Sequence, residues 1–365
     1  MSAPAIEPTP GRPARSALQP GVGPIRARAY LPADPEAVLW GRLPCAADSP
    51  VLTVASGDEV TVDTISHEGI LEDQGRDPEA FFGRHGVTEV LTDAVALAAG
   101  DHPHTVGVDG PHVVSRPIAV DGAQPGDLLA ITVVETLPRV PYGVVSNRHG
   151  RGALPDAYPL GGVPLHSVFT PVHTDPDGVD RARIGTARFE LAPFLGILGV
   201  AVPGSARPHS VPPGTHGGNL DIRLLTAGAT LYLPVQVAGA LAYLGDPHFA
   251  QGDGEVSLTA LEASLRATVR LDVIAREQAV AAYGEIVGPL AETTEFLVPT
   301  GLDPDLDVAV QNCVRASIAL LQARFAMSAG DAYAYLSAAT DFRISQVVDQ
   351  VKGVHATIRK ADFSL

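Results

Sequence analysis

The stretch GDPHFAQGDGEV, residues 245–256, gathers four acidic and imidazole side chains among its glycines. Asp246 and His248 stand two residues apart, and so do Asp253 and Glu255. Residues i and i+2 of an extended strand project from the same face, so each pair could line one wall of a site. Carboxylates and imidazoles in that arrangement are typical ligands and bases of hydrolytic metal sites. The alternative is a run of tight surface turns with solvated acids, and the spacing does not decide between a site wall and surface turns.

Three further stretches concentrate the same residue types: VDTISHEGI (62–70), SVPPGTHGGNLDIR (210–223) and DGPHVVSRPI (109–118), which contains His112. In the first, Asp63 and His67 stand where a predicted strand leaves its sheet, a common position for functional residues. A structural hydrogen bond between the two is the alternative. In the second, Gly218 would let the backbone approach a ligand closely, and Asn219 and Asp221 follow it. The alternative there is a polar turn in which both side chains cap backbone groups.

Several common catalytic motifs are missing from the sequence. It contains no Gly-x-Ser-x-Gly elbow, no P-loop and no Gly-x-Gly-x-x-Gly fingerprint. Its lysines are Lys352 and Lys360, which excludes the Ser-Ser-Lys arrangement of signature amidases and the Glu-Lys-Cys arrangement of nitrilase-type enzymes. For a hydrolase, the sequence therefore favours a water molecule activated by a metal or a carboxylate over a covalent nucleophile.

Composition narrows the class of protein. The 365 residues are 45% hydrophobic, which predicts a packed globular fold, and 37 glycines with 32 prolines predict many turns between short strands. A net charge of −16 disfavours binding to nucleic acids or anionic membranes and suits a small neutral substrate. With two cysteines, no apolar run of about 18 residues and no secretory signal, we expect a cytoplasmic protein that does not span a membrane.

The elements that must position these residues can be outlined from periodicity. Alternation of apolar and polar residues predicts a β-hairpin over 49–69, and runs of apolar and β-branched residues predict strands within 124–138, 188–204 and 229–245. A helix is predicted within 303–325 with Asp303 as its N-cap, and a shorter one over 328–339. We therefore expect a flexible tail over 1–24, a β-rich body over 25–285 and a C-terminal α/β portion over 286–365 packed on the body.

At this point a family resemblance becomes visible. Residues 217–262 contain a Gly-Gly-Asn-x-Asp loop, a Leu-Pro-Val strand end and the segment Gly-Asp-x-His-x-x-Gln-Gly-Asp-Gly-Glu, in that order. This order closely resembles the acetamidase/formamidase family. The resemblance extends to VTVDTISHEGI (60–70), PHVVSRPIAVDGAQPGDLL (111–129), SNRHGRGALP (146–155) and AATDFRISQVVD (338–349).

The resemblance implies a fold, an assembly and an activity. The fold would be a distorted, jelly-roll-like β-sandwich with an additional α/β portion, assembled as homo-oligomers. The activity would be hydrolysis of a short linear amide, such as formamide or acetamide, to the carboxylic acid and ammonia. One departure is that Arg116 stands where the family has glycine. This substitution favours an alternative, a hydrolase of a larger or cyclic amide; a non-catalytic β-sandwich binding protein is another.

For the mechanism, we expect the histidine-containing loops to converge on a divalent cation. Its ligands would come from His67, His112, Asp221 and His248. Zinc is the expected ion, with calcium, magnesium or no metal as alternatives. Glu255 is the expected general base, and Asp253 is a second catalytic carboxylate. Asp63 would orient a ligating histidine, and Asn219 would hold the substrate carbonyl or the oxyanion. Gly218 and Arg116 would line the substrate pocket.

Overall fold

The computed structural model describes residues 16–363, and the first part of the predicted tail lies outside them. Residues 16–24 lie against the body of the protein. The backbone N–H of Leu18 donates to the carbonyl of Arg139, and Arg266 donates to the carbonyls of Val22 and Pro24. The ordered body therefore begins before residue 25.

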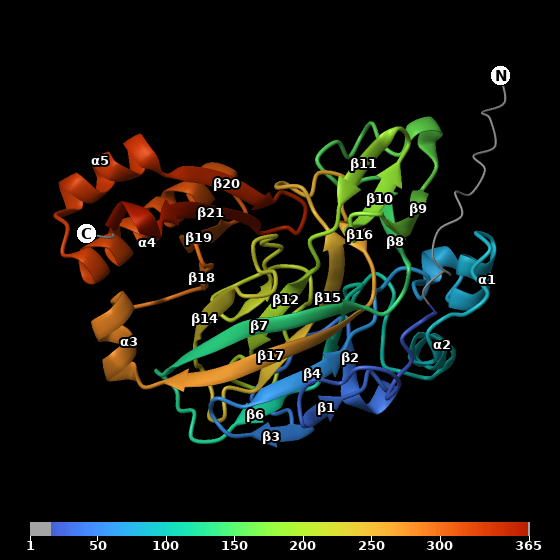
Figure 1. The fold of residues 1–365 in the computed structure, drawn as a ribbon, viewed down its shortest axis with the longest axis horizontal. Helices are drawn as coiled ribbons and strands as arrows, with labels where there is room; N and C mark the ends of the chain where they lie inside the picture. The colour runs from blue at the N-terminus through green and yellow to red at the C-terminus, as the bar shows by residue number, and fades with distance from the viewer. Residues whose placement is uncertain (1–15, 364–365) are drawn as a thin grey trace.

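The strands of the described residues are arranged in two large sheets (Figure 1). The first has nine strands in the order β1 (Ala29–Leu31), β4 (Glu59–Asp63), β17 (Leu265–Ile274), β7 (Leu128–Pro138), β14 (Thr230–Pro234), β18 (Leu290–Glu292), β19 (Phe296–Asp303), β21 (Lys352–Arg359) and β20 (Asp341–Gln346). Its longest pairing joins β7 and β17, which run antiparallel over ten residue pairs with one bulge.

The second sheet carries most of the site. Its main path is β11 (Ala187–Glu190), β10 (Asp180–Ile184), β9 (Leu165–Thr174), β8 (Tyr142–Arg148), β16 (Leu261–Glu262), β15 (Ala242–Ala250), β12 (Phe194–Val200) and β13 (Gly217–Asn219). Four short strands attach to it through β15: β5 (Val113–Ser115), β6 (Ile118–Val120), β2 (Val38–Trp40) and β3 (Leu52–Val54).

One hydrophobic core joins the two sheets. It contains Val62, Leu129 and Val133 from the first sheet together with Leu198 and Leu244 from the second, all buried. Each such side chain stabilises the fold by roughly 1.5–3 kcal/mol when it is fully removed from water. The predicted sandwich body is therefore confirmed, and the fold is mainly β.

Helices lie at two ends of the molecule (Figure 1). The short helices α1 (Pro78–Gly83) and α2 (Thr92–Ala99) lie at one end, and α3 (Arg276–Tyr283), α4 (Leu306–Phe325) and α5 (Ala329–Ala339) at the other. A second core packs Leu320 and Leu336 of these last helices against Leu297 and Ile358 of the first sheet. Within the described residues, no helix has the length and apolar character needed to cross a membrane.

Two local predictions need correction. The predicted hairpin over 49–69 does not form, because β3 pairs with β6 in the second sheet whereas β4 pairs with β1 and β17 in the first. Helix α4 begins at Leu306 with Asp305 as its N-cap, rather than with Asp303. The carboxylate of Asp305 accepts from the N–H groups of Asp307 and Val308, which satisfies two of the first free donors of the helix.

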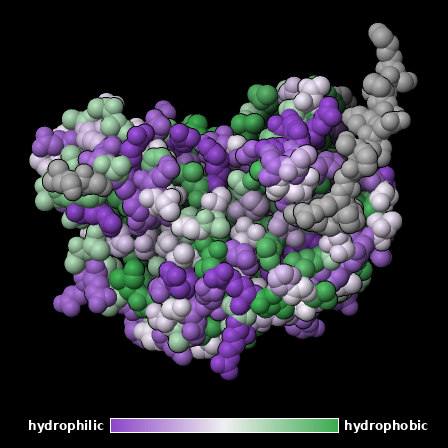
Figure 2. Space-filling model, viewed as in Figure 1, coloured by the Kyte–Doolittle hydropathy of each residue, from purple (hydrophilic) through white to green (hydrophobic). Residues whose placement is uncertain are grey.

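The surface mixes residue types. Figure 2 shows hydrophobic residues scattered among hydrophilic ones on the face that it presents. This agrees with a water-exposed sandwich, since the apolar faces of both sheets are directed into the shared core.

Candidate active site

A cavity of about 340 Å³ lies beside strands β15 and β16. Its lining comes from six segments far apart in the chain: residues within 67–73, 104–112, 148–151, 209–221, 246–262 and 348–350. The last of these follows β20, so the C-terminal portion contributes directly to a site carried by the second sheet.

Buried histidines and carboxylates cluster at the inner end of this cavity. They form three overlapping groups whose possible ligand atoms lie within 4.8 Å of one another: His67 with His112 and Asp246, Asp246 with His248 and Glu262, and Asp221 with His248 and Glu255. Asp246 belongs to the first and second groups and His248 to the second and third, so the three groups form one continuous centre.

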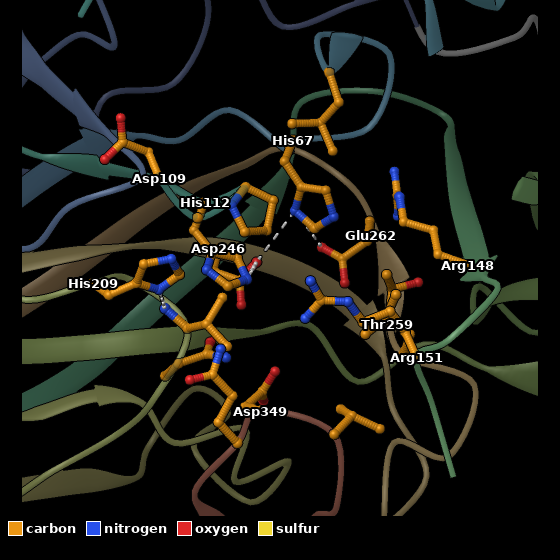
Figure 3. Close-up of a pocket in the computed structure, with 18 of the residues that line it drawn as sticks. His67, Asp109, His112, Arg148, Arg151, His209, Asp246, Thr259, Glu262 and Asp349 are labelled. Atoms are coloured by element: carbon orange, nitrogen blue, oxygen red, sulfur yellow. Dashed lines mark hydrogen bonds and ion pairs between the residues drawn. The ribbon is translucent and has the colours of Figure 1, made fainter. Parts of the chain in front are cut away.

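Asp246 bridges the centre (Figure 3). Its Oδ1 lies 3.7 Å from Nδ1 of His67 and 3.9 Å from Nε2 of His112, whereas its Oδ2 lies 3.1 Å from Nε2 of His248. Glu262 makes a similar link, with Oε1 3.1 Å from Nε2 of His248 and Oε2 3.9 Å from Nδ1 of His67. Each carboxylate therefore directs its two oxygens at different imidazoles.

Strand β12 leaves room for the centre at Gly196. A Cβ atom on this residue would lie 2.5 Å from Oδ1 of Asp221 and 2.6 Å from Cε1 of His248, and closer still to Oδ2 of Asp246. Real Cβ atoms do not approach other heavy atoms so closely, so the position requires glycine. The carboxylates of β15 and of the 217–221 loop thus lie directly over the backbone of β12.

Three of the site carboxylates have a strained backbone. Asp221, Asp246 and Glu255 have φ angles of 49°, 52° and 45°, in the left-handed region that residues with a Cβ rarely adopt. Such conformations cost on the order of 1–3 kcal/mol each and persist where the surroundings impose them. Here Gln251 donates to the carbonyl of Asp221, and the N–H of Gly254 donates to the carbonyl of Ser345.

The pKa values of the acids in the centre are shifted in opposite directions. Burial and the charge of Asp246 raise the pKa of Asp221 to about 7. Burial and the charge of Asp221 raise the pKa of Glu255 and that of Asp349 well above their usual range. For Asp246, burial also acts to raise the pKa, but the charges of His248 and His112 outweigh it and hold the pKa low. The pKa is therefore held low where imidazoles face the buried carboxylate, and it is raised where another carboxylate faces it.

The histidines are divided in the same way. Burial lowers the pKa of His67, but the charge of Glu262 and contacts with Asp246 and Glu68 outweigh it and raise the pKa to about 10. Burial lowers the pKa of His112 to about 4. His112 is thus a neutral imidazole at pH 7, with Nδ1 3.0 Å from Oγ of Ser210 and Nε2 facing Asp246.

Several buried atoms of the centre have no hydrogen-bond partner among the described residues. They are Nδ1 of His67, both carboxylate oxygens of Asp221, Oδ1 of Asp246 and Oε2 of Glu262. Buried polar atoms are normally paired, so a group of such atoms directed at one another needs an explanation. Imidazole nitrogens and carboxylate oxygens are the donors that zinc accepts, and the residues present therefore fit a divalent cation.

The structure brings together most of the predicted site residues. His67, His112, Asp221 and His248 meet in the buried centre, and Glu255 and Asn219 line the cavity. Three residues of the site were not among the predicted ligands and catalytic residues: Asp246, Glu262 and Asp349. The spacing had singled out Asp246 together with His248 as a possible wall of a site, whereas nothing in the spacing singled out the other two.

Four predicted residues lie elsewhere. Asp253 pairs with Arg223 and Arg343, at 2.9 Å and 3.5 Å, and does not line the cavity. Gly218 pairs with Leu198 between β13 and β12. Arg116 is also absent from the cavity lining, and its buried Nε has no partner among residues 16–363.

Asp63, the fourth, belongs to a buried ion pair instead of orienting a histidine. Its Oδ1 lies 2.6 Å from Nε of Arg266 and its Oδ2 lies 2.9 Å from Nη2 of the same residue. The hydroxyl of Tyr30 also donates to Oδ2, at 2.6 Å. Both charged side chains are almost completely buried, so this pair ties β4 to β17.

Replacing Asp63 with asparagine should therefore act on stability. Loss of one partner leaves a buried guanidinium without its carboxylate, which typically costs about 3 kcal/mol or more. We expect the free energy of unfolding in urea to fall by about that amount. The exposed pair Arg270–Asp272 is a matched control, because Asp272→Asn should cost less than about 1 kcal/mol. Equal losses for the two variants would contradict the assignment.

The fold and the centre together define a β-sandwich protein with a buried histidine–carboxylate site inside a cavity. Comparison with known proteins gives the family. The model of the acetamidase/formamidase family matches residues 98–210 and 203–359, and the chain belongs to this family.

Characterised relatives carry the corresponding names. Over an alignment of 234 residues, the chain is 29% identical to an acetamidase of Mycolicibacterium smegmatis, and the match covers 49% of this chain and 57% of that protein. Over an alignment of 192 residues, it is 28% identical to a formamidase of Methylophilus methylotrophus, and the match covers 40% of this chain and 47% of that protein. The chain thus spans about half the length of the curated relatives that it matches.

Solved structures match over nearly the whole chain. An acetamidase from Bacillus halodurans superposes with a TM-score of 0.71 at 26% identity, covering 92% of this chain and 98% of that one. An acetamidase from Yersinia enterocolitica gives a TM-score of 0.73 at 24% identity, with coverage of 95% and 96%, and supports the fold alone.

Proposed function

We propose that the protein hydrolyses a short linear carboxamide, of the formamide or acetamide type, to the carboxylic acid and ammonia. The observation that carries this proposal is the buried histidine–carboxylate centre at the end of a cavity, in a chain that belongs to the acetamidase/formamidase family. The names of the relatives supply the substrate class.

A divalent cation, with zinc as the first choice and calcium or magnesium as alternatives, would be held within the three groups of the centre. The predicted ligands His67, His112, Asp221 and His248 would be joined by Asp246, whose oxygens face two of the groups. When bound, such an ion polarises a carbonyl and lowers the pKa of a water molecule toward about 7.

Glu255 is the proposed general base. It is buried and lines the cavity, and burial together with the charge of Asp221 raises its pKa well above the usual range, which makes its carboxylate a stronger proton acceptor than that of an exposed glutamate. Glu255 would take a proton from the attacking water and pass it to the amide nitrogen. The carbon–nitrogen bond then breaks, and the products are the carboxylic acid and ammonia.

Asn219 is the proposed contact for the substrate carbonyl. It is buried, lines the cavity and carries an Oδ1 without a partner in the described part of the chain. Its amide N–H group can donate to the oxygen as negative charge develops there, a contribution of about 3 kcal/mol where a comparable donor has been removed.

Two further expectations follow from the family and the composition. We propose that the chain forms a homo-oligomer, as the family resemblance implies, and that it works in the cytoplasm, where its two buried free cysteines would stay reduced. Light scattering coupled to size exclusion tests the first, since a monomer at micromolar concentration would contradict it.

The larger- or cyclic-amide alternative rested on Arg116, which does not line the cavity. Ammonia release from formamide, acetamide and propionamide by the purified protein tests the proposed function. We expect turnover of at least one of the three, with the rate reporting how large an acyl group the cavity accepts. Absence of ammonia from all three would overturn the proposed substrate class.

A further inference from the structure

We propose that Glu68 positions His67 to bind the cation; this inference rests on the proposed function, because it assumes that the centre holds a divalent ion. The two ring nitrogens of His67 face different carboxylates. Nδ1 lies 3.7 Å from Oδ1 of Asp246, inside the centre, and Nε2 lies 3.4 Å from Oε1 of Glu68. Figure 3 shows His67 directed toward Asp246 and Glu262.

Glu68 is itself held in place. The hydroxyl of Ser146 donates to its Oε2 at 2.6 Å, and the side-chain amide of Gln74 donates to the same oxygen. Gln74 is fixed in turn, because its Oε1 accepts from the N–H of Gly69 at 2.6 Å. Glu68 and Gln74 are both buried, so this carboxylate has little freedom to move away from the ring.

The contact fixes which nitrogen of His67 carries a proton in the neutral ring. An ionised carboxylate can only accept hydrogen bonds, so the nitrogen that faces Glu68 must be the N–H. Glu68 already accepts hydrogen bonds from the hydroxyl of Ser146 and the side-chain amide of Gln74, as a carboxylate does. In a neutral ring with Nε2 protonated, the lone pair of Nδ1 is free for an ion. Nδ1 of His67 and Oε1 of Glu68 are both buried atoms without a hydrogen-bond partner among the described residues, and Nε2 faces Oε1 at 3.4 Å.

Glu68 therefore has the role that the sequence suggested for Asp63. A carboxylate that accepts from the far nitrogen of a ligating histidine sets its tautomer and ring orientation and makes it a better donor to the metal. Because Glu68 follows His67 directly, one tight turn at 67–70 delivers both groups. Gly69, with φ of 89°, allows this turn to pack against Phe82.

Zinc binding to the metal-stripped full-length protein, measured by competition with a chromogenic chelator, tests the inference. Glu68→Gln should weaken zinc binding about tenfold to about hundredfold. The matched control is Glu72→Gln, which lines the cavity but pairs with His104 and Arg76 outside the centre. It should change the affinity by less than about twofold.

A double-mutant cycle separates positioning from general damage. If Glu68 acts through His67, then Glu68→Gln should have no further effect on zinc affinity in a His67→Ala background. Thermal unfolding of the metal-free variants reports whether they fold. Should Glu68→Gln not fold, Ser146→Ala, which removes one donor to Glu68, should still weaken zinc binding about threefold or more.

Two results would overturn this inference and leave the proposed function standing. One is an unchanged zinc affinity in Glu68→Gln. The other is that Glu68→Gln weakens zinc binding in the His67→Ala background as much as in the wild type. For a Glu68→Gln variant that does not fold, unchanged affinity in Ser146→Ala would do the same. A wild-type protein that binds neither zinc nor calcium nor magnesium gives a different result. It would remove the cation from the proposed function and the inference with it.

Discussion

Replacing Glu255 with glutamine should lower kcat for ammonia release about 10²–10⁴-fold, the usual contribution of a positioned general acid or base. Glutamine keeps the size of the side chain but cannot accept the proton of the attacking water. The effect should fall on kcat more than on KM, because proton transfer occurs in the transition state. Steady-state assays with the best of the three small amides measure it.

Two controls accompany this variant. Its metal content must be measured by elemental analysis, because Glu255 also belongs to one of the possible ligand groups. A role as general base predicts that the metal content matches that of the wild type. The metal-free variant should unfold at a higher temperature than the wild type at pH 8. The pKa of Glu255 is raised by folding, so ionising it costs the folded state stability once the pH exceeds the unfolded value of about 4.3. Wild-type kcat with unchanged metal content would contradict the assigned role.

Replacing Gly196 with alanine should abolish activity and metal binding together. The added Cβ would overlap Asp221, His248 and Asp246, which come from two different segments of the chain. These contacts are with the ends of buried side chains that have little room to move, so relaxation must displace ligand atoms. Overpacking of this kind costs about 1–3 kcal/mol. Ammonia release and zinc binding measured on the same preparation check both effects.

Gly288 is the matched control for this substitution. A Cβ there would meet nothing within 4 Å, so Gly288→Ala should change neither activity nor zinc affinity. A Gly196→Ala variant that binds zinc and turns over amides at wild-type levels would show that the centre is not built over β12 as described.

The sequence predicted the histidines and Asp221 of the centre, but it did not predict the carboxylate Glu262 that lies beside them. His67, His112, Asp221 and His248 were selected because imidazoles and carboxylates stand in loops beside predicted strands, and the sandwich brings those loops together. Glu262 lies on a two-residue strand in an apolar stretch, where no spacing rule marks it. Its role depends on pairing between β15 and β16, which is a tertiary contact.

The errors have local physical causes. Asp63 was expected to orient a ligating histidine because it stands with His67 where a strand leaves its sheet. Strand β4 ends at Asp63, however, and directs that carboxylate to Arg266 on β17. The alternation over 49–69 correctly marks two strands, since β3 and β4 both form. Alternation does not say which sheet each strand joins, and the chain crosses between the sheets at that turn.

The most direct test of the account measures ammonia release from acetamide and formamide by one preparation in three states: as purified, after removal of metal by a chelator, and after zinc is added back. Elemental analysis follows the metal in each state. We predict that the stripped protein loses activity at least about hundredfold and regains it with about one equivalent of zinc or more per chain. A preparation shown to be free of metal that releases ammonia at the original rate would contradict the cation-dependent mechanism.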